Sequence, residues 1–509
     1  MFLKGLSLNH DDVAVVKKRL ALWIFAYLAI HFLIRLTLGG TLGWDDSEQA
    51  LWSQELSPGY TLFQPPFYSW LFTVTTWIFG QNVLTTALVR YGLMLATYLL
   101  ILDMASRLVQ QGRQLVLAVT GYGLIYVFAY YAHHDLTNTT LLSFALALSL
   151  NLFLRLPKNP NLLLYSLLGV GLGIGLLAKF NFLLFMLALV VAALICPGYR
   201  GALLNWRMVW SGGIVLLMFS PYAFWYIENG HSVAGMTDEI LAPEGPSWMA
   251  PVLALGLWLV ALLSFPQPLV LVMALLFPES FRWHNAGGKD AGSKGIDEAR
   301  RFLGWTILVA AVAVGVGGLL AGVTELKSRW MHPVLMFLPL YLFSGDLNTE
   351  RLPKRLRIFL RVLIVFSALV LISRFVTHHL EPRNSRNARQ TVPIAGLREP
   401  IERLGLNNPV FVAERDHLGG NLVFAIPGAE VYTLEDDPRR WDVPRDRDRL
   451  YLWVLGDEHI PERIQDHIVK TRGIRLDAIE PDGVLSVPFP SYPERTMEVA
   501  YLIIESEPR

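Results

Sequence analysis

The sequence predicts a polytopic α-helical membrane protein with a soluble α/β domain at its C-terminus. Of the 509 residues 53% are hydrophobic, and the mean hydropathy is +0.41, which is too apolar for a soluble protein of this length. Apolar windows of spanning length recur up to about Thr377, where the composition changes to that of an ordinary soluble protein. A formal net charge of +1 without a basic arm argues against a nucleic-acid binder.

Eleven windows are apolar and long enough to span a bilayer when short or tilted helices are allowed. They fall at about residues 20–38, 84–106, 114–131, 138–155, 161–178, 180–197, 208–227, 250–279, 302–323, 331–346 and 356–377. Pro266 and Pro268 can split the window 250–279 into two shorter elements. The distribution of positive charges favours one kinked helix. The number of spans is then odd, and the positively charged loops lie on one side of the membrane, as the positive-inside rule requires.

Charge also predicts the orientation of the chain in the cytoplasmic (inner) membrane. Lys17, Lys18 and Arg19 precede the first window without a cleavage site, so we expect an uncleaved first helix with its N-terminus in the cytoplasm. The opposite side keeps few cations in its short loops, chiefly Lys179, Lys327 and Arg329. The first long loop and the C-terminal region are therefore predicted on the periplasmic or extracytoplasmic side.

Two domains follow from this pattern: a transmembrane domain over residues 1–379, whose first outer loop covers 39–82, and an outer α/β domain over 380–509. The second half of that loop, 67–79, is apolar but short for a span and predicts an amphipathic helix at the membrane interface. In the C-terminal domain, strands are predicted at 409–413, 430–433 and 449–454, and helices at 400–404 and 460–471. Cys196 is the one cysteine of the chain, which excludes an intrachain disulfide.

The strongest candidates for chemistry are the carboxylates of Trp44-Asp45-Asp46-Ser47-Glu48, just after the first window. Carboxylates facing lipid are costly, so we expect these to lie in water or to line a polar cavity. Crowded acids can act as a general base or bind a divalent cation. The alternative is structural: Asp46 or Ser47 caps a helix that runs through Ala50 to Glu55.

Two further polar groups are predicted on the same face. Gln64-Pro65-Pro66 is a rigid turn. Its glutamine can donate or accept hydrogen bonds beside the carboxylates, or it can be a solvated loop residue. His133-His134-Asp135 offers weak candidates for a metal site, because adjacent residues rarely bind one ion together. Asp135 and Thr137 can instead cap the next helix, which begins near Asn138.

Lys179 lies at a sharp outer turn between two apolar windows, and Arg329 precedes His332-Pro333 on the same predicted face. Each cation can snorkel to lipid headgroups or bind a phosphate at the membrane surface. Cations beside carboxylates at one membrane face suit a phosphate leaving group.

The order of these motifs resembles the polyprenyl-phosphate-sugar-dependent glycosyltransferases of the bacterial protein-mannosyltransferase type, in the GT-C superfamily. This family includes the lipid A aminoarabinose and galacturonic acid transferases. Its pattern is an Asp-Glu pair after the first span and His-Pro-Pro about twenty residues later, which here read Asp45-Asp46 and Gln64-Pro65-Pro66. Later landmarks are Lys179, Pro221 with Trp225, and Arg329-Trp330 with Pro333.

The resemblance covers roughly residues 15–380 and implies a sugar transfer from a polyprenyl-phosphate donor to a lipid, glycan or protein acceptor. By position, Asp45 is the catalytic carboxylate, and Asp46, where the family has Glu, assists it. The chain departs from the family at Gln64, where the family has His. It also departs at Asn138 or Thr139, where an Asp is common in the family and Asp135 can take its role. The substrate-binding candidates are Glu48, Gln64, Asp135, Asn138, Lys179 and Arg329.

In this mechanism the carboxylate takes the acceptor's proton opposite the leaving phosphate, which gives inversion. No defined cofactor is predicted, and the need for a divalent cation stays open. A transporter or flippase for lipid-linked sugars is the alternative from another class. It predicts inverted repeats and midplane charges, whereas this chain has no obvious repeat and gathers its charges at one face.

Overall fold

The computed structural model describes residues 12–229, 250–281, 291–321, 328–345, 347, 350–379, 390–435, 442–455, 460–472, 480–490 and 492–506. The predicted outer cation Lys327 lies outside these residues. By its contacts the chain divides into two compact units. The first contains Met1–Ala29, Gly92–His133 and Asn138–Val370, and the second contains Ile30–Tyr91, His134–Thr137 and Leu371–Arg509.

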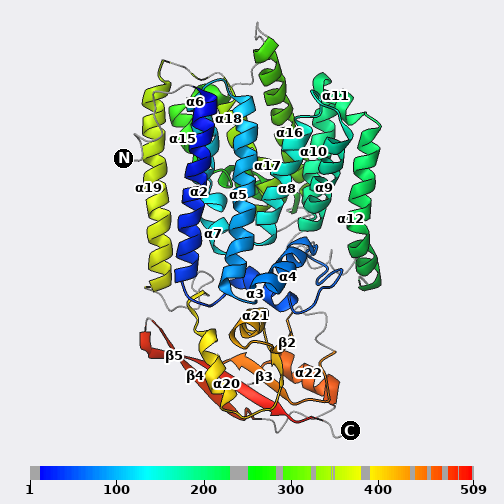
Figure 1. Ribbon diagram of the computed structural model, residues 1–509, viewed down its shortest axis with the longest axis vertical. Helices are drawn as coiled ribbons and strands as arrows, with labels where there is room; N and C mark the ends of the chain where they lie inside the picture. Colours follow the sequence, from blue (N-terminus) through cyan, green and yellow to red (C-terminus); the bar gives the residue numbers. More distant parts are fainter. Residues whose placement is uncertain are drawn as a thin grey trace. The chain divides into compact units, whose positions relative to one another are not determined.

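The first unit is helical, and Figure 1 labels most of its elements. Four of its described helices, α2, α5, α7 and α19, continue into the second unit. In chain order the elements are α2 (Val13–Thr37), α5 (Val83–Leu108), α6 (Gly112–Thr120), η1 (Gly121–Leu124), the π-helix η2 (Val127–Tyr131), α7 (Ala132–His134), α8 (Asn138–Phe153), α9 (Leu162–Ala178), α10 (Phe182–Ile195), α11 (Pro197–Leu203), α12 (Arg207–Asn229), α14 (Ala250–Ser264), α15 (Leu269–Leu276), η3 (Pro278–Phe281), α16 (Ala291–Ala321), η4 (Ser328–Met331), α17 (His332–Leu335), α18 (Leu338–Phe343) and α19 (Leu352–His379).

Five of these helices are long and apolar enough to cross a membrane: α2, α5, α12, α16 and α19. Four shorter apolar helices, α8, α9, α10 and α14, match further predicted windows. The polytopic helical class is thereby confirmed, whereas the number of eleven spans stays a prediction.

One window differs from the prediction. The stretch 250–279 is not a single kinked helix, because α14 ends at Ser264 and α15 begins at Leu269. Pro268 between them has no N–H to continue a helix, and it forms an isolated β-bridge with Ile125 instead. Ile125 itself lies in a break in the window 114–131, between η1 and η2.

Close contacts at two glycines and a polar cluster around Asp103 link helices of the first unit. A Cβ on Gly169 would lie 2.8 Å from the Ser211 carbonyl oxygen of α12, and one on Gly173 would lie 2.7 Å from Met218 Sδ. The absence of side chains at these two positions of α9 therefore allows the tight packing typical of membrane helices. Asp103 of α5 accepts hydrogen bonds from Lys17 (2.8 Å) of α2 and Asn151 (3.0 Å) of α8.

The second unit is built on a five-stranded mixed sheet. Its strands are β1 (Val410–Ala413), β2 (Glu430–Thr433), β3 (Arg449–Val454), β4 (Gly483–Phe489) and β5 (Tyr492–Ile504), in the order β2-β1-β3-β5-β4. β1 pairs in parallel with β2 and β3, with Val410 opposite both Glu430 and Arg449, whereas β5 runs antiparallel to β3 and β4. The other elements of this unit are α3 (Trp44–Trp52), α4 (Phe67–Phe79), η6 (Ile394–Leu397), α20 (Arg398–Glu402), α21 (Asp416–Ala425) and α22 (Glu462–Arg472).

Each face of the sheet has its own apolar core. On one face Ile464 and Ile468 of α22 pack with Val412 and Trp453. On the other, α21 and η6 pack with Phe411 and Leu450, and Leu51 and Trp52 of α3 belong to the same core. Figure 1 shows α21 between the sheet and α3. The helix that carries the candidate carboxylates is therefore part of the core of the sheet domain.

Most predicted elements of this unit are confirmed. β1, β2 and β3 match the predicted strands, α20 and α22 match the predicted helices, and α4 spans the predicted stretch 67–79. The sequence reasoning missed α21, β4 and β5. In α4 the buried face carries Tyr68, Ser69, Phe72, Thr73 and Thr76, which recur with the period of a helix.

Candidate functional site

The acidic helix α3 begins at Trp44 and is capped from a distant part of the chain. Its N-cap is Gly43, which has no side chain to cap with, and Asp135 Oδ1 accepts a hydrogen bond of 3.1 Å from the Asp45 N–H. A Cβ on Gly43 would lie only 2.4 Å from Asp135 Oδ1, so a larger residue at this position would displace the Asp135 carboxylate. The predicted cap by Asp46 or Ser47 is wrong: Asp135 satisfies the first turn, and Ser47 Oγ donates back to the Trp44 carbonyl (2.7 Å).

Asp46 is committed to a buried ion pair. Its side chain is 1% exposed, and its Oδ1 accepts from Arg90 Nη2 of α5 at 2.6 Å. Arg90 Nη1 donates to the His134 carbonyl oxygen at 3.0 Å, which also accepts from Gln390 Nε2 at 2.9 Å. Removing one partner of such a pair would leave an uncompensated buried charge. Asp46 and Arg90 therefore lock the first turn of α3 to α5.

Asp45 is in a different environment although it is the adjacent residue. It is only half-buried, and its Oδ2 accepts a long hydrogen bond of 3.5 Å from the Thr137 N–H. Glu48, three residues later and also half-buried, lies on the same side of the helix. The carboxylates of Asp45 and Glu48 are thus the accessible ones in this turn.

The charges of these acids affect one another. Burial raises the pKa of Asp135 well above its usual value, and the negative charges of Asp45 and Asp46 raise it further, against the effect of Arg90. Asp135 therefore holds a proton more readily than an isolated aspartate. Burial likewise raises the pKa of Tyr68 in α4, and Asp46 and Asp45 add to the shift, so its hydroxyl stays protonated.

Several buried polar atoms around α3 and α4 have no hydrogen-bond partner within the described part of the chain. They are Asp46 Oδ2, Gln49 Nε2, Tyr68 OH and Thr73 Oγ1. Gln49 accepts from Ser69 Oγ at 2.7 Å, which ties α3 to α4. Buried polar groups are costly unless they are hydrogen-bonded. These four atoms are therefore suited to hydrogen bonds with a bound polar ligand.

The turn predicted at Gln64-Pro65-Pro66 starts α4, since Pro66 is its N-cap residue. Gln64 is half-buried, and both prolines are buried. The histidines serve different contacts: His133 Nε2 lies 3.0 Å from the Tyr27 hydroxyl, whereas His134 contributes its backbone carbonyl to Arg90 and Gln390. Among the described residues no three His, Cys, Asp or Glu side chains gather around a point that could hold a metal ion.

The predicted phosphate-binding cations belong to the first unit. Lys179 is the C-cap residue of α9, and its Nζ donates to Thr139 Oγ1 at 2.8 Å. Asn138, next to Thr139, is buried at the start of α8. Arg329 is exposed in η4. The structure thus places Lys179 beside Asn138 and Thr139, and it brings together Asp45, Asp46 and Asp135 in the second unit.

Comparison with known proteins decides the family. The chain is 30% identical over 487 residues to the lipopolysaccharide core galacturonosyltransferase RgtB of Rhizobium johnstonii, covering 92% of this chain and 94% of that protein. It is 29% identical to RgtA of the same organism, covering 93% and 94%. Residues 63–225 match the dolichyl-phosphate-mannose-protein mannosyltransferase family. By its identity to RgtB, the chain belongs to the same family of glycosyltransferases as RgtB.

The fold of this glycosyltransferase is similar to that of a solved structure. ArnT from Cupriavidus metallidurans bound to undecaprenyl phosphate superposes with a TM-score of 0.55 at 14% identity, covering 96% of this chain and 99% of that chain. The apo state of the same protein gives 0.53 at 13% identity, covering 94% and 97%. The predicted GT-C fold and glycosyltransferase class are confirmed, and these similarities do not support the transporter alternative.

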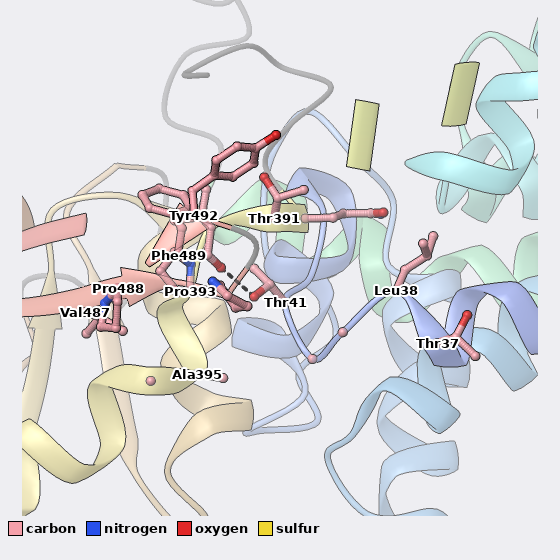
Figure 2. Close-up of a pocket in the computed structure, with 16 residues that line it drawn as sticks. Thr37, Leu38, Thr41, Thr391, Pro393, Ala395, Val487, Pro488, Phe489 and Tyr492 are labelled. Atoms are coloured by element: carbon pink, nitrogen blue, oxygen red, sulfur yellow. Dashed lines mark hydrogen bonds between the residues drawn. The ribbon is translucent and has the colours of Figure 1, made fainter. Parts of the chain in front are cut away.

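The glycosyltransferase also has a cavity of about 650 Å³ within its second unit. Figure 2 shows its walls, which come from the end of α2 with the following loop, from residues 390–396, and from the β4–β5 turn. Its lining contains Phe489, Tyr492 and three threonines but no charged side chain, so it offers no cation to a phosphate. Gln390 in its wall donates to the His134 carbonyl next to Asp135, so the cavity adjoins the carboxylate cluster.

Sequence reasoning missed three residues of this cluster: Arg90, Tyr68 and Gln390. A signal existed for Arg90, because an arginine within an apolar spanning helix usually faces the protein interior and pairs with an acid. Tyr68 and Gln390 carry no comparable signal, since their roles depend on contacts made by distant parts of the chain.

Proposed function

We propose that this glycosyltransferase transfers a sugar from a polyprenyl-phosphate donor to an envelope acceptor, with inversion at the anomeric carbon and Asp45 as the general base. The single observation that carries the assignment is the contrast in the first turn of α3. Asp46 forms a buried ion pair with Arg90, whereas the Asp45 carboxylate is half-buried and lies on the accessible side of the helix. The ArnT neighbour, which was solved with undecaprenyl phosphate, supports the class of donor lipid.

The reaction is a single displacement. The acceptor hydroxyl oxygen forms a bond to the anomeric carbon, and its proton passes to the Asp45 carboxylate. The bond between that carbon and the phosphate oxygen breaks, and polyprenyl phosphate leaves with the electron pair. Asp46 assists by fixing the turn that carries Asp45. Lys179 and Arg329 are proposed to attract the donor phosphate, and Glu48, Gln64, Asp135 and Asn138 to contribute to substrate binding.

For the sugar we propose a hexuronic acid, and for the acceptor the lipopolysaccharide core. The support is the identity of about 30% over most of the chain to two lipopolysaccharide core galacturonosyltransferases. The test uses purified protein in lipid nanodiscs with polyprenyl-phosphate galacturonate and a core acceptor. We expect transfer by the wild type and its loss in Asp45→Asn. Movement of the donor lipid across the bilayer without any transfer would contradict the proposal.

We further propose that residues 380–509 and the carboxylate cluster lie on the periplasmic or extracytoplasmic side. The support is the positive-inside pattern of the loops. Because Cys196 is the one cysteine, a Cys196→Ala background accepts single reporters. A membrane-impermeant maleimide should label Ser486→Cys on exposed β4 in intact spheroplasts, and Lys158→Cys between α8 and α9 only after lysis. The reverse pattern would overturn the orientation.

A further inference from the structure

Helix α21 of the C-terminal sheet domain contacts the acidic helix α3 at backbone distance. A Cβ built on Gly420 would lie 1.8 Å from the Ser47 carbonyl oxygen. No side chain fits there, and because the clashing atom belongs to a backbone, it cannot swing aside. The neighbouring Gly419 faces the other way, where a Cβ would lie 2.3 Å from Thr433 Cγ2 of the sheet. The two glycines thus let α21 fit between α3 and the sheet.

Polar side chains of α21 hold the residues that lead directly into Asp45. The buried Asn421 accepts a hydrogen bond from the Leu42 N–H through Oδ1 at 2.7 Å, and its Nδ2 donates to the His417 carbonyl at 2.7 Å. His417 Nε2 lies 3.1 Å from the Leu42 carbonyl oxygen. The His417 ring also stacks on Trp44, with a centroid distance of 6.2 Å and an angle of 8° between the planes. Leu42 is therefore bound through both its N–H and its carbonyl.

These contacts fix the rotation of α3. Successive side chains of a helix point in directions about 100° apart, so the rotation of α3 about its axis sets the direction of the Asp45 carboxylate. A rotation of α3 would therefore turn this carboxylate away from its substrate. Apolar burial of Leu51 and Trp52 holds the far end of the helix but leaves the direction of its first turn to polar contacts. Misplacing a reacting group by about 1 Å can cost on the order of 100-fold in rate.

We infer that α21 is a positioning element of the transferase centre, with Asn421 and Gly420 as positioning residues that aim the Asp45 carboxylate. The inference rests on the proposed role of Asp45. It assigns the C-terminal domain a function in the chemical step, in addition to any contact that the domain makes with the acceptor.

The first test separates position from stability with a matched pair of variants. Gly420→Ala pushes α21 away from the backbone of α3, whereas Gly419→Ala pushes it away from the sheet. We expect Gly420→Ala to lower kcat about 10- to 100-fold with unchanged KM for donor and acceptor. Gly419→Ala should lower the melting temperature while the folded fraction keeps its kcat. Equal kcat losses in the two variants would overturn the inference.

The second test uses Asn421. Asn421→Leu removes the acceptor for the Leu42 N–H, and we expect it to lower kcat about tenfold or more. Asn421→Asp keeps an oxygen at that position, so it should recover most of the rate. Full activity of Asn421→Leu would contradict the inference.

The closing experiment combines Asn421→Leu with Asp45→Asn in the same transfer assay. If Asn421 acts by aiming Asp45, the second substitution should not reduce the residual rate of Asp45→Asn further. A further tenfold loss would show a general structural effect and overturn the positioning role. Unchanged transfer by Asp45→Asn alone is a separate outcome, which would overturn the proposed function and, with it, this inference.

Discussion

The two ends of helix α3 differ in what they do, although the helix has only nine residues, from Trp44 to Trp52. In the first turn, Asp135 accepts a hydrogen bond from the Asp45 N–H, and the Asp46 carboxylate is paired with Arg90. The last turn buries Leu51 and Trp52 in the apolar core of the sheet domain. One short helix therefore belongs to the site at one end and to the domain core at the other, so the folding of the domain and the geometry of the site are coupled.

The largest effect should come from the first turn. Asp45→Asn keeps the size of the side chain but removes the base, and general-base catalysis contributes about 10²–10⁴-fold. We expect kcat to fall by that factor with an unchanged melting temperature, measured on the same purified sample. Loss of activity together with loss of folding would place Asp45 among the structural residues.

Breaking the buried ion pair should act on stability. Arg90→Met leaves Asp46 buried without its partner, which typically costs about 3–5 kcal/mol. Thermal unfolding in detergent measures this loss. The double variant Arg90→Met/Asp46→Leu should recover most of it, because two apolar side chains need no charge compensation. A double variant as unstable as Arg90→Met would show that the pair itself is needed for folding.

The last turn should show a smaller loss of stability. Leu51→Ala removes a fully buried side chain from the core of the sheet domain and should cost about 2–5 kcal/mol. Leu56→Ala, four residues after the helix at a side chain that is 48% exposed, is the matched control and should change little. Equal effects of the two substitutions would contradict the position of α3 in the core.

The pH dependence of stability should be the smallest effect. The pKa of Asp135 is raised in the folded protein, so the folded state binds this proton more tightly than the unfolded state does. Its contribution is therefore fully present below the ordinary aspartate pKa and is lost as pH rises through the raised value. Melting temperatures between about pH 4 and pH 8 should decline more for the wild type than for Asp135→Asn. An equal decline of the two melting temperatures with pH would contradict the raised pKa of Asp135.

The sequence could predict those structural features that depend on a local pattern of residues. The apolar windows, the strands β1 to β3 and the helix α4 follow from hydrophobic runs and turn residues. Asp45 stood out because three acids follow a spanning segment and the motif order resembles a family. These features need no knowledge of distant contacts.

The rest depends on contacts that local patterns do not encode. The Gly419-Gly420 pair in α21 disfavours a helix by propensity, and only the packing between α3 and the sheet explains it. Prolines at 488, 490 and 493 obscure β4 and β5, since proline is typical of turns and edge strands. The capping of α3 by Asp135, 90 residues away from Asp45, replaced the local cap that the sequence suggested.

The most direct test compares single-turnover transfer by Asp45→Asn with that of the double variant Arg90→Met/Asp46→Leu, at equal amounts of folded protein. We expect Asp45→Asn to be slower than the wild type by at least about 100-fold, and the double variant by less than about tenfold. The reverse order, with Asp45→Asn near the wild-type rate and the double variant inactive, would contradict the account of Asp45 as the base and Asp46 as its support.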